Sequence, residues 1–206
     1  MIIDDLQKIS FSLHIGLVGI QDAGKDIILE FFKEKAIETN YDSEEKTKDK
    51  IYEFFLVFKD FPINLKMYLA ETIQELTFDY ETIKRLDIVI LALNLYNLSS
   101  KNKYMKEQFE EFIEEFMFSG ISVLLGLDVE LILKGTPSKE FRISKYNLVQ
   151  KAKELDILYC FEILNKKGDL QEFYNKLLGD FTFKFQFTNP EILEKAREYG
   201  KTLIKQ

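Results

Sequence analysis

The stretch "LHIGLVGIQDAGKDIILEFF", Leu13 to Phe32, decides the fold because it joins three elements in a telling succession. Its first eight residues form a nearly continuous apolar run, which predicts a buried strand. In its second half, Ile27, Ile28 and Phe31 recur at helical spacing. A glycine-containing loop therefore lies between a strand and a helix.

That loop, "GIQDAGKD", carries the features of a phosphate-binding loop of the pattern G-x-x-x-x-G-K-[ST]. In such a loop the backbone amides and the helix N-terminus bind phosphate, the lysine reaches the outer phosphates, and the final hydroxyl ligates magnesium. An aspartate stands here in place of the hydroxyl. The candidate cofactor-binding residues of the loop are Gly19, Asp22, Ala23, Gly24, Lys25 and Asp26.

The rest of the chain alternates short apolar runs with amphipathic segments. Apolar runs predict strands at 87–95, 121–127 and 158–164, and helical periodicity predicts helices at 102–118, 144–155 and 170–178. Two more runs, 51–58 and 63–70, flank the turn "KDFP" and predict a hairpin, while the polar segment Glu38–Lys50 predicts a loop. This order predicts an α/β fold with a mostly parallel, helix-flanked sheet and one antiparallel hairpin strand.

A C-terminal extension, residues 180–206, is predicted to follow a main domain of residues 1–179. In "FTFKFQF", one face of a predicted strand carries four phenylalanines: Phe181, Phe183, Phe185 and Phe187. Pro190 is expected to begin a last helix. An exposed apolar strand invites pairing with another chain. The extension is therefore expected either to pack on its own core or to form an interface in a homo- or hetero-oligomer.

Three later segments fall where nucleotide-binding motifs are expected, and with the loop they resemble the small GTPases of the Ras superfamily. In that family a hairpin's second strand ends in D-T-A-G-Q-E, and here it ends in "AETIQE", Ala70–Glu75. The V-G-N-K-x-D-L motif corresponds to "LGLDVEL", Leu125–Leu131, and E-T-S-A-K corresponds to "EILNK", Glu162–Lys166. The resemblance spans Leu13 to Leu178 and implies a P-loop small-GTPase domain that binds GTP or GDP with Mg²⁺.

The resemblance also implies roles for single residues. Lys25 would contact phosphate, Asp26 would be the magnesium ligand, and Gln74 would be the catalytic residue that orients the attacking water. Glu130 stands where the family's acid binds the base, and Lys166 matches the last lysine of the pattern. The magnesium-binding threonine is expected in the polar loop, where the candidates are Thr39, Ser43 and Thr47.

The departures from the family pattern replace, at each of these motifs, a side chain that binds magnesium, phosphate or guanine in the family. Asp26 can ligate magnesium, but two unit charges about 4 Å apart repel by about 4 kcal/mol at an effective dielectric of about 20, so its carboxylate opposes a bound phosphate. Asp22 adds to that repulsion. Ala70 and Ile73 replace an aspartate and a glycine of the second motif. The residues that frame guanine are replaced by Leu127 and Asp128.

Composition excludes several other classes of function. The chain has 28 Lys and Arg against 35 Asp and Glu, a net charge of −7, and no long basic cluster, so nucleic acid is not the expected partner. Cys160 is the only cysteine and His14 the only histidine, which leaves too few ligands for a zinc or Cys-His site and fits a cytoplasmic location. No signal peptide, lipidation motif or membrane-spanning run is present, so no membrane anchor is expected.

Three functions remain open. The first is a degenerate small GTPase (pseudo-GTPase), a regulatory or scaffolding module that has lost GTP hydrolysis and binds nucleotide weakly or not at all. The second is a divergent but working guanine-nucleotide switch with slow GTPase activity. The third, compatible with the first, is an assembly subunit that uses the Phe181–Phe187 segment.

Overall fold

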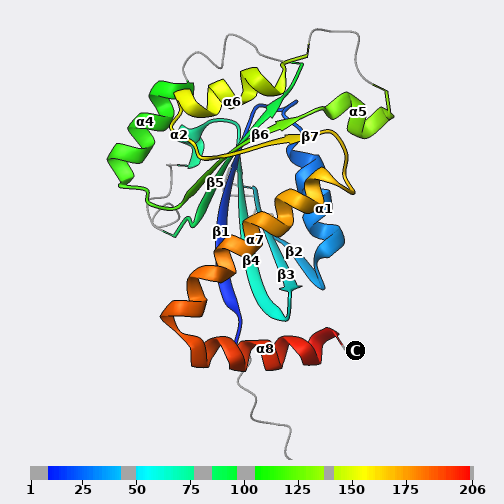
Figure 1. The fold of residues 1–206 in the computed structure, drawn as a ribbon, viewed down its shortest axis with the longest axis vertical. Coiled ribbons are helices and arrows are strands. Elements are labelled where there is room, and N and C mark those ends of the chain that lie inside the picture. The colour runs from blue at the N-terminus through cyan, green and yellow to red at the C-terminus, as the bar shows by residue number, and fades with distance from the viewer. Residues whose placement is uncertain (1–8, 43–49, 77–84, 97–104, 137–141, 205–206) are drawn as a thin grey trace, which may run out of the picture.

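The computed structural model describes residues 9–42, 50–76, 85–96, 105–136 and 142–204. Its strands form one seven-stranded sheet in the order β2-β3-β4-β1-β5-β6-β7, with helices on both faces (Figure 1). The predicted α/β class and the mostly parallel, helix-flanked sheet are therefore confirmed.

The strands are β1 (Phe11–Val18), β2 (Glu38–Asp42), β3 (Lys50–Phe58), β4 (Phe61–Ala70), β5 (Ile88–Asn94), β6 (Ile121–Leu127) and β7 (Tyr159–Ile163). The described helices are α1 (Lys25–Lys35), α2 (Ile73–Leu76), α4 (Met105–Phe116), α5 (Val129–Lys134), α6 (Lys145–Glu154), α7 (Asp169–Thr188) and α8 (Pro190–Ile204). Strand β1 pairs in parallel with β4 and β5, and β5–β6 and β6–β7 are also parallel. Only β3 is reversed, since it runs antiparallel to both β2 and β4.

The predicted hairpin is β3 and β4, whose turn places Lys59 at φ 47° and Asp60 at φ 69°. Two consecutive left-handed residues are typical of a type I′ turn, whose twist matches that of the flanking strands. The turn thus fixes the register in which Phe58 pairs with Phe61.

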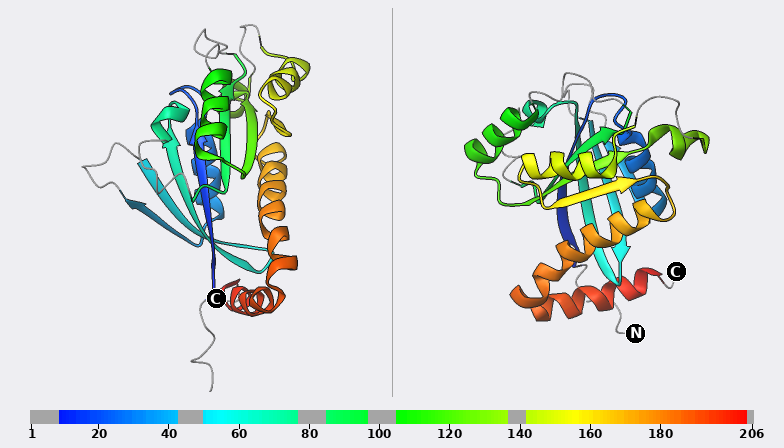
Figure 2. Two further views of the ribbon diagram at one scale, coloured as in Figure 1. Left: turned by 90° about the vertical axis from the view of Figure 1, so that its left-hand side faces the viewer. Right: turned by 45° about the horizontal axis from the view of Figure 1, so that its top comes forward.

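The two faces of the sheet carry separate apolar clusters, because successive side chains on a strand point to opposite faces. On β5, Ile88 and Ile90 join the cluster that α1, α7 and α8 cover, whereas Val89 and Leu91 join the cluster that α2, α4 and α6 cover. Figures 1 and 2 show α4 and α1 on opposite sides of the sheet and α8 across its end. Burial on both faces explains why β5 and β6 read as continuous apolar runs.

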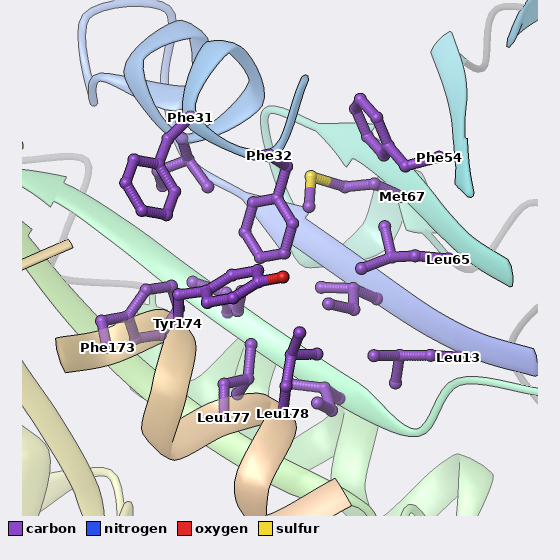
Figure 3. Packing of buried hydrophobic residues seen from close by; sticks show 14 of the residues in the cluster. Leu13, Phe31, Phe32, Phe54, Leu65, Met67, Phe173, Tyr174, Leu177 and Leu178 are labelled. Atoms are coloured by element: carbon purple, nitrogen blue, oxygen red, sulfur yellow. The ribbon is translucent and has the colours of Figure 1, made fainter. Parts of the chain in front are cut away.

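Aromatic packing dominates the first cluster (Figure 3). Tyr174 of α7 lies edge-to-face against Phe31 and Phe32 of α1, with ring centroids 5.8 and 5.5 Å apart, and against Phe58 of β3 at 5.7 Å. Edge-to-face pairs of this kind contribute about 0.5–1.5 kcal/mol each beyond their buried area. Helix α1, which continues from the loop Gly19–Asp26, is therefore packed tightly against α7.

Helix α8 lies across the end of the β3–β4 hairpin (Figures 1 and 2). Its buried residues Leu193 and Ala196 join the first cluster, and the Arg197 guanidinium lies 4.7 Å from the ring centroid of Phe61. Gly200 packs so closely that an added Cβ would overlap the backbone oxygen of Asp60. Pro190 begins the helix, as predicted. No helix within the described ranges is long and apolar enough to cross a bilayer.

The strand predicted for Phe181–Phe187 is wrong, because α7 continues as one helix from Asp169 through Gly179 to Thr188. On a strand the four phenylalanines would share a face, but on a helix residues four apart share one. Phe181 and Phe185 accordingly pack inward, and Phe183 and Phe187 are exposed.

The loop predicted for Glu38–Lys50 is also wrong in part, because β2 occupies Glu38–Asp42 and Lys50 begins β3. Strand β2 is held by antiparallel pairing with β3, in which Glu38 lies opposite Phe55. Residues 43–49 lie outside the described ranges.

Candidate functional site

The loop from Gly19 to Asp26 follows β1 at the carboxyl edge of the parallel sheet. Strand β1 is central, with β4 on one side and β5 on the other, so the connections on its two sides leave in opposite directions. Ligands of open α/β sheets bind in the crevice at such a switch point. The predicted loop therefore occupies the position where this architecture places a binding site.

The loop backbone requires both of its glycines. Gly24 has φ 83°, in the left-handed region that glycine adopts without penalty, and an added Cβ would lie 3.0 Å from Val129 and 3.2 Å from Leu127. An added Cβ at Gly19 would lie 2.8 Å from the backbone oxygen of Ala92. Apolar side chains of the β6–α5 connection thus pack directly on the loop, in the segment where the family pattern has Asn, Lys and Asp.

The amino group of Lys25 bonds to backbone oxygens within the protein. Its Nζ donates to the oxygen of Gly19 and, over 2.9 Å, to the oxygen of Ala70. The backbone N–H of Gly19 donates to the same Ala70 oxygen over 3.1 Å. Lys25 therefore connects the start of the loop to the end of β4 in this conformation.

A cavity of about 650 Å³ lies beside the loop. Gln21, Asp22, Gly24 and Asp26 line it from the loop side, and Lys166 lines it from beyond β7. The lining is completed by residues after β5, around β6–α5 and on α1: Ile27, Glu30, Asn94, Tyr96, Val129, Glu130 and Leu133. The ends of four parallel strands thus contribute, and residues of the loop, Glu130 and Lys166 line the same cavity. Ala23 of the loop is fully buried, and Lys25 is not among the lining residues.

The charges that line this cavity are mostly negative. Four carboxylates contribute to the lining, those of Asp22, Asp26, Glu30 and Glu130, and Lys166 is the single cation among the lining residues that the structure describes. Glu130 is paired with Lys134 over 2.6 Å, at the outer side of the short α5 helix. Because like charges about 4 Å apart repel by about 4 kcal/mol at an effective dielectric of about 20, this lining disfavours a di- or triphosphate.

Asp128 is the most deeply buried carboxylate near the cavity, at 1% exposure. Its side chain caps α5 by accepting from the N–H of Leu131 over 2.9 Å, and it accepts from the Tyr96 hydroxyl over 3.1 Å. Arg142 Nε lies 3.2 Å from the same carboxylate, at ion-pair distance but outside hydrogen-bond geometry, and its Nη2 donates to Glu162 over 2.5 Å. The position where the family pattern has a base-framing lysine is instead a structural network.

Sequence reasoning missed Tyr96 and Arg142 in this network. Asp128 directly precedes α5, and an aspartate at that position is the usual sign of a helix cap. Arg142 is separated from Asp128 by fourteen positions and follows residues outside the described ranges. No local pattern pairs the two, so only the fold reveals the contact.

The structure does not bring Gln74 into the cavity lining. Gln74 is exposed on the short α2 helix, where its Oε1 accepts from Gln108 Nε2 over 3.5 Å. Its neighbour Ile73 is 2% exposed and packs in the second cluster, so the residue aligned with the glycine of the GTPase pattern is a core residue here.

Asp26, the predicted magnesium ligand, is exposed at the start of α1. It also borders a second hollow of about 490 Å³ between α1 and β2–β3, which Thr39 and Tyr52 line. Of the three threonine and serine candidates, Thr39 is therefore near Asp26, while Ser43 and Thr47 lie outside the described ranges. Within those ranges, no three His, Cys, Asp or Glu side chains converge as a metal site.

His14 lies in β1 away from the cavity lining, and its Nδ1 is 2.9 Å from the hydroxyl of Tyr68. Burial lowers the pKa of His14 below its usual value, which favours the neutral ring. Burial likewise raises the pKa of Cys160, so its thiol is not activated as a nucleophile.

A scan against protein-family models found no match for the chain, and a search of the curated proteins found none either.

Proposed function

We propose that the protein is a degenerate small-GTPase-like protein, a pseudo-GTPase that acts as a regulatory or scaffolding interaction module. In this proposal GTP hydrolysis is lost and nucleotide binding is weak or absent. The single cysteine of the chain makes the reducing cytoplasm its expected location.

One observation carries this proposal: among the described residues, four carboxylates and one lysine line the cavity beside the loop. Phosphate-binding sites depend on positive charge and free N–H donors. Here Lys25 donates to two backbone oxygens, and Asp26 stands where the magnesium-binding hydroxyl is expected. Gln74, expected to orient the attacking water, lies on α2 outside the cavity lining.

A divergent guanine-nucleotide switch with slow GTPase activity is the second candidate. Gly24 keeps the left-handed conformation that lets the loop backbone turn, and the cavity volume of about 650 Å³ falls within the range of small-molecule sites. If a nucleotide binds there, Lys25 must exchange its contacts with carbonyl oxygens for contacts with phosphate.

Fluorescence titration of the full chain with mant-GDP and mant-GTP, with and without Mg²⁺, tests the proposal. We expect no saturable binding below the micromolar range for the natural sequence. Asp26→Ser restores the hydroxyl and removes one negative charge, so it should tighten mant-GDP binding by at least about tenfold, which corresponds to about 1.4 kcal/mol.

Glu111→Ser, which removes an exposed carboxylate from α4, is the matched control and should change nothing. Micromolar or tighter binding of either nucleotide by the natural sequence would overturn the proposal in favour of the switch. Nucleotide released by heat from natively purified protein would lead to the same conclusion.

A further inference from the structure

The last turns of α7 present two aromatic rings to solvent. Phe183 and Phe187 are 56% and 76% exposed, and their ring centroids lie 5.2 Å apart in an edge-to-face pair. Residues four apart on a helix occupy the same side, so the pair forms a short apolar ridge. On the opposite side of the same turns, Phe181 and Phe185 pack in the first cluster.

Helix α8 begins three residues after Phe187, and its first turns carry an acidic hollow. The hollow measures about 440 Å³ and is lined by Pro190, Glu191, Glu194, Lys195 and Glu198. Glu194 is paired with Arg197 over 2.9 Å, whereas no ion pair is found for Glu191 or Glu198 within the described ranges. Among the described residues, the three carboxylates of the hollow are opposed by Lys195 and by Arg197, which pairs with Glu194, so the hollow keeps a net negative charge.

The ridge and the hollow are held together by the corner between α7 and α8, which Figures 1 and 2 show at the end of the sheet. Asn189 N–H donates to the oxygen of Phe185, and Leu193 N–H donates to the oxygen of Asn189, each over 3.1 Å. Buried Leu193 then fixes the rotation of α8 that turns its glutamates outward. Only Asn189 separates the two helices, so the corner is preorganised, which lowers the cost of binding.

We propose that this corner, defined by Phe183, Phe187 and the hollow, docks an amphipathic helix of a partner protein that carries Lys or Arg beside an apolar stripe. The phenylalanine pair supplies an apolar ridge one helical turn long, which suits the i, i+3 and i+4 spacing of a facing helix. The glutamates then meet the partner's cations. Buried aromatic anchors with a complementary charged rim are the usual basis of such interfaces.

Charge argues against two other occupants. A second copy of the chain would bring its own Glu191, Glu194 and Glu198 against the same three carboxylates. An anionic lipid surface would also be repelled by the hollow, and the chain as a whole carries a net charge of −7. The apolar ridge and the negative charge of the hollow together favour a cationic amphipathic helix as the occupant.

This surface would serve the interaction role proposed above and so rests on that function. A peptide titration measures binding at the corner alone, whereas the mant-nucleotide titration measures binding in the cavity. If the peptide fails to bind, the assignment of the corner fails while the cavity result stands. If nucleotide binds tightly, the pseudo-GTPase proposal fails while the peptide result stands.

The probe is a fluorescein-labelled synthetic helix of about 18 residues, roughly five turns, with leucines at i, i+3, i+4 and i+7 and lysines elsewhere. Its partner probe keeps the leucines and replaces every lysine by glutamate. In fluorescence anisotropy the full chain should bind the lysine helix and not the glutamate helix. Binding should weaken as salt rises.

Phe183→Ser/Phe187→Ser and Glu191→Lys/Glu198→Lys should each weaken binding of the lysine helix by at least about tenfold, the effect of losing central anchors or their charged rim. Leu158→Ser, which removes another apolar side chain that is 91% exposed, is the matched control and should leave binding unchanged. Circular dichroism confirms that each variant is folded.

Equal binding of the two helices, or a loss in Leu158→Ser as large as that in the phenylalanine variant, would overturn the proposal. Sedimentation of the chain alone tests the second copy. A dimer that Phe187→Ser dissociates would show that the corner joins two copies and would also overturn the assignment of a cationic partner. Flotation with phosphatidylserine vesicles that depends on the two phenylalanines would show that the corner binds a membrane. This result would also overturn the assignment of a cationic partner.

Discussion

Lys25 of α1 and Ala70 at the end of β4 are joined by a hydrogen bond of 2.9 Å, from the amino group of the lysine to the backbone oxygen of the alanine. The same amino group also donates to the oxygen of Gly19. A residue that the sequence assigns to phosphate binding thus joins two neighbouring strand ends.

Lys25→Met should therefore destabilise the fold itself. Two backbone oxygens lose a charged donor, and hydrogen bonds to charged groups contribute about 1.5–3 kcal/mol, so we expect a loss of that size in urea unfolding. Lys33→Met, whose ion pair with Glu30 is exposed and 3.7 Å long, should cost less than about 1 kcal/mol. A fully stable Lys25→Met variant that loses nucleotide affinity would return Lys25 to a phosphate-binding role.

The Asp128–Arg142 ion pair should be important for stability. Arg142→Met leaves the carboxylate of Asp128 buried without its cation, and breaking a buried pair costs about 3–5 kcal/mol; because Arg142 is partly exposed, we expect roughly 2–3 kcal/mol. Asp128→Asn/Arg142→Met removes both charges and should recover part of the loss. Urea unfolding of the four proteins in a double-mutant cycle measures the coupling.

Lys151→Met is the control for this cycle, since the Lys151–Glu154 pair is a surface contact of 3.7 Å. If the double variant is no more stable than Arg142→Met, then Arg142 acts through its contact with Glu162 instead of through Asp128.

Two helical glycines should respond oppositely to alanine. At Gly179 an added Cβ meets nothing within 4 Å, so Gly179→Ala should stabilise α7 by about 0.5–1 kcal/mol through helix propensity. At Gly200 the added Cβ would overlap the backbone oxygen of Asp60, so Gly200→Ala should cost about 1–3 kcal/mol. Thermal and urea unfolding measure both. A gain at both sites would show that α8 does not pack closely on the hairpin.

Tyr174 should make the protein sensitive to alkaline pH. Burial raises the pKa of Tyr174 from 10.0 to about 12, so between these values the unfolded chain loses the phenolic proton before the folded chain does. The free energy of unfolding should therefore fall as pH rises from 10 to 12, by roughly 2–3 kcal/mol in total.

Tyr174→Phe should remove this part of the pH dependence. Tyr146→Phe is the matched control because Tyr146 is 70% exposed. Denaturant unfolding at several pH values between 9 and 12 gives the comparison. Identical slopes for Tyr174→Phe and the natural sequence would contradict the assigned burial of the phenol.

Much of the fold could be predicted because its signals are local. The apolar runs that became β1, β5 and β6 are buried on both faces, and the turn at Lys59 and Asp60 separates two complete strands. Strand β2 was missed because it has no apolar alternation and depends on pairing with β3, which is a non-local contact.

The segment after Gly179 shows where local pattern alone is ambiguous. Phenylalanine at every second position satisfies a strand with period two, but Phe181 and Phe185 also continue the helical face begun by Leu177 and Leu178. Extending an existing helix avoids the cost of a new nucleus, so the helical solution prevails.

The candidate site was predictable to the extent that strand ends meet at one edge of the sheet. This rule brings Asp26, Glu130 and Lys166 to one cavity. The rule does not locate Gln74, which leaves with α2, or the bonds of Lys25 to carbonyl oxygens. The place of Gln74 and the hydrogen bonds of Lys25 depend on how whole helices pack, and a short sequence motif carries no information on that packing.

Helix α7 begins three residues after Lys166 and ends at the α7–α8 corner, and its 20 residues span about 30 Å. A molecule in the cavity and a helix at the corner would thus be too far apart to collide. Both could be held at once, and each could be titrated while the other is saturated. Binding in the cavity would affect binding at the corner only through a movement of α7 relative to the sheet, with the aromatic ring of Tyr174 as the pivot.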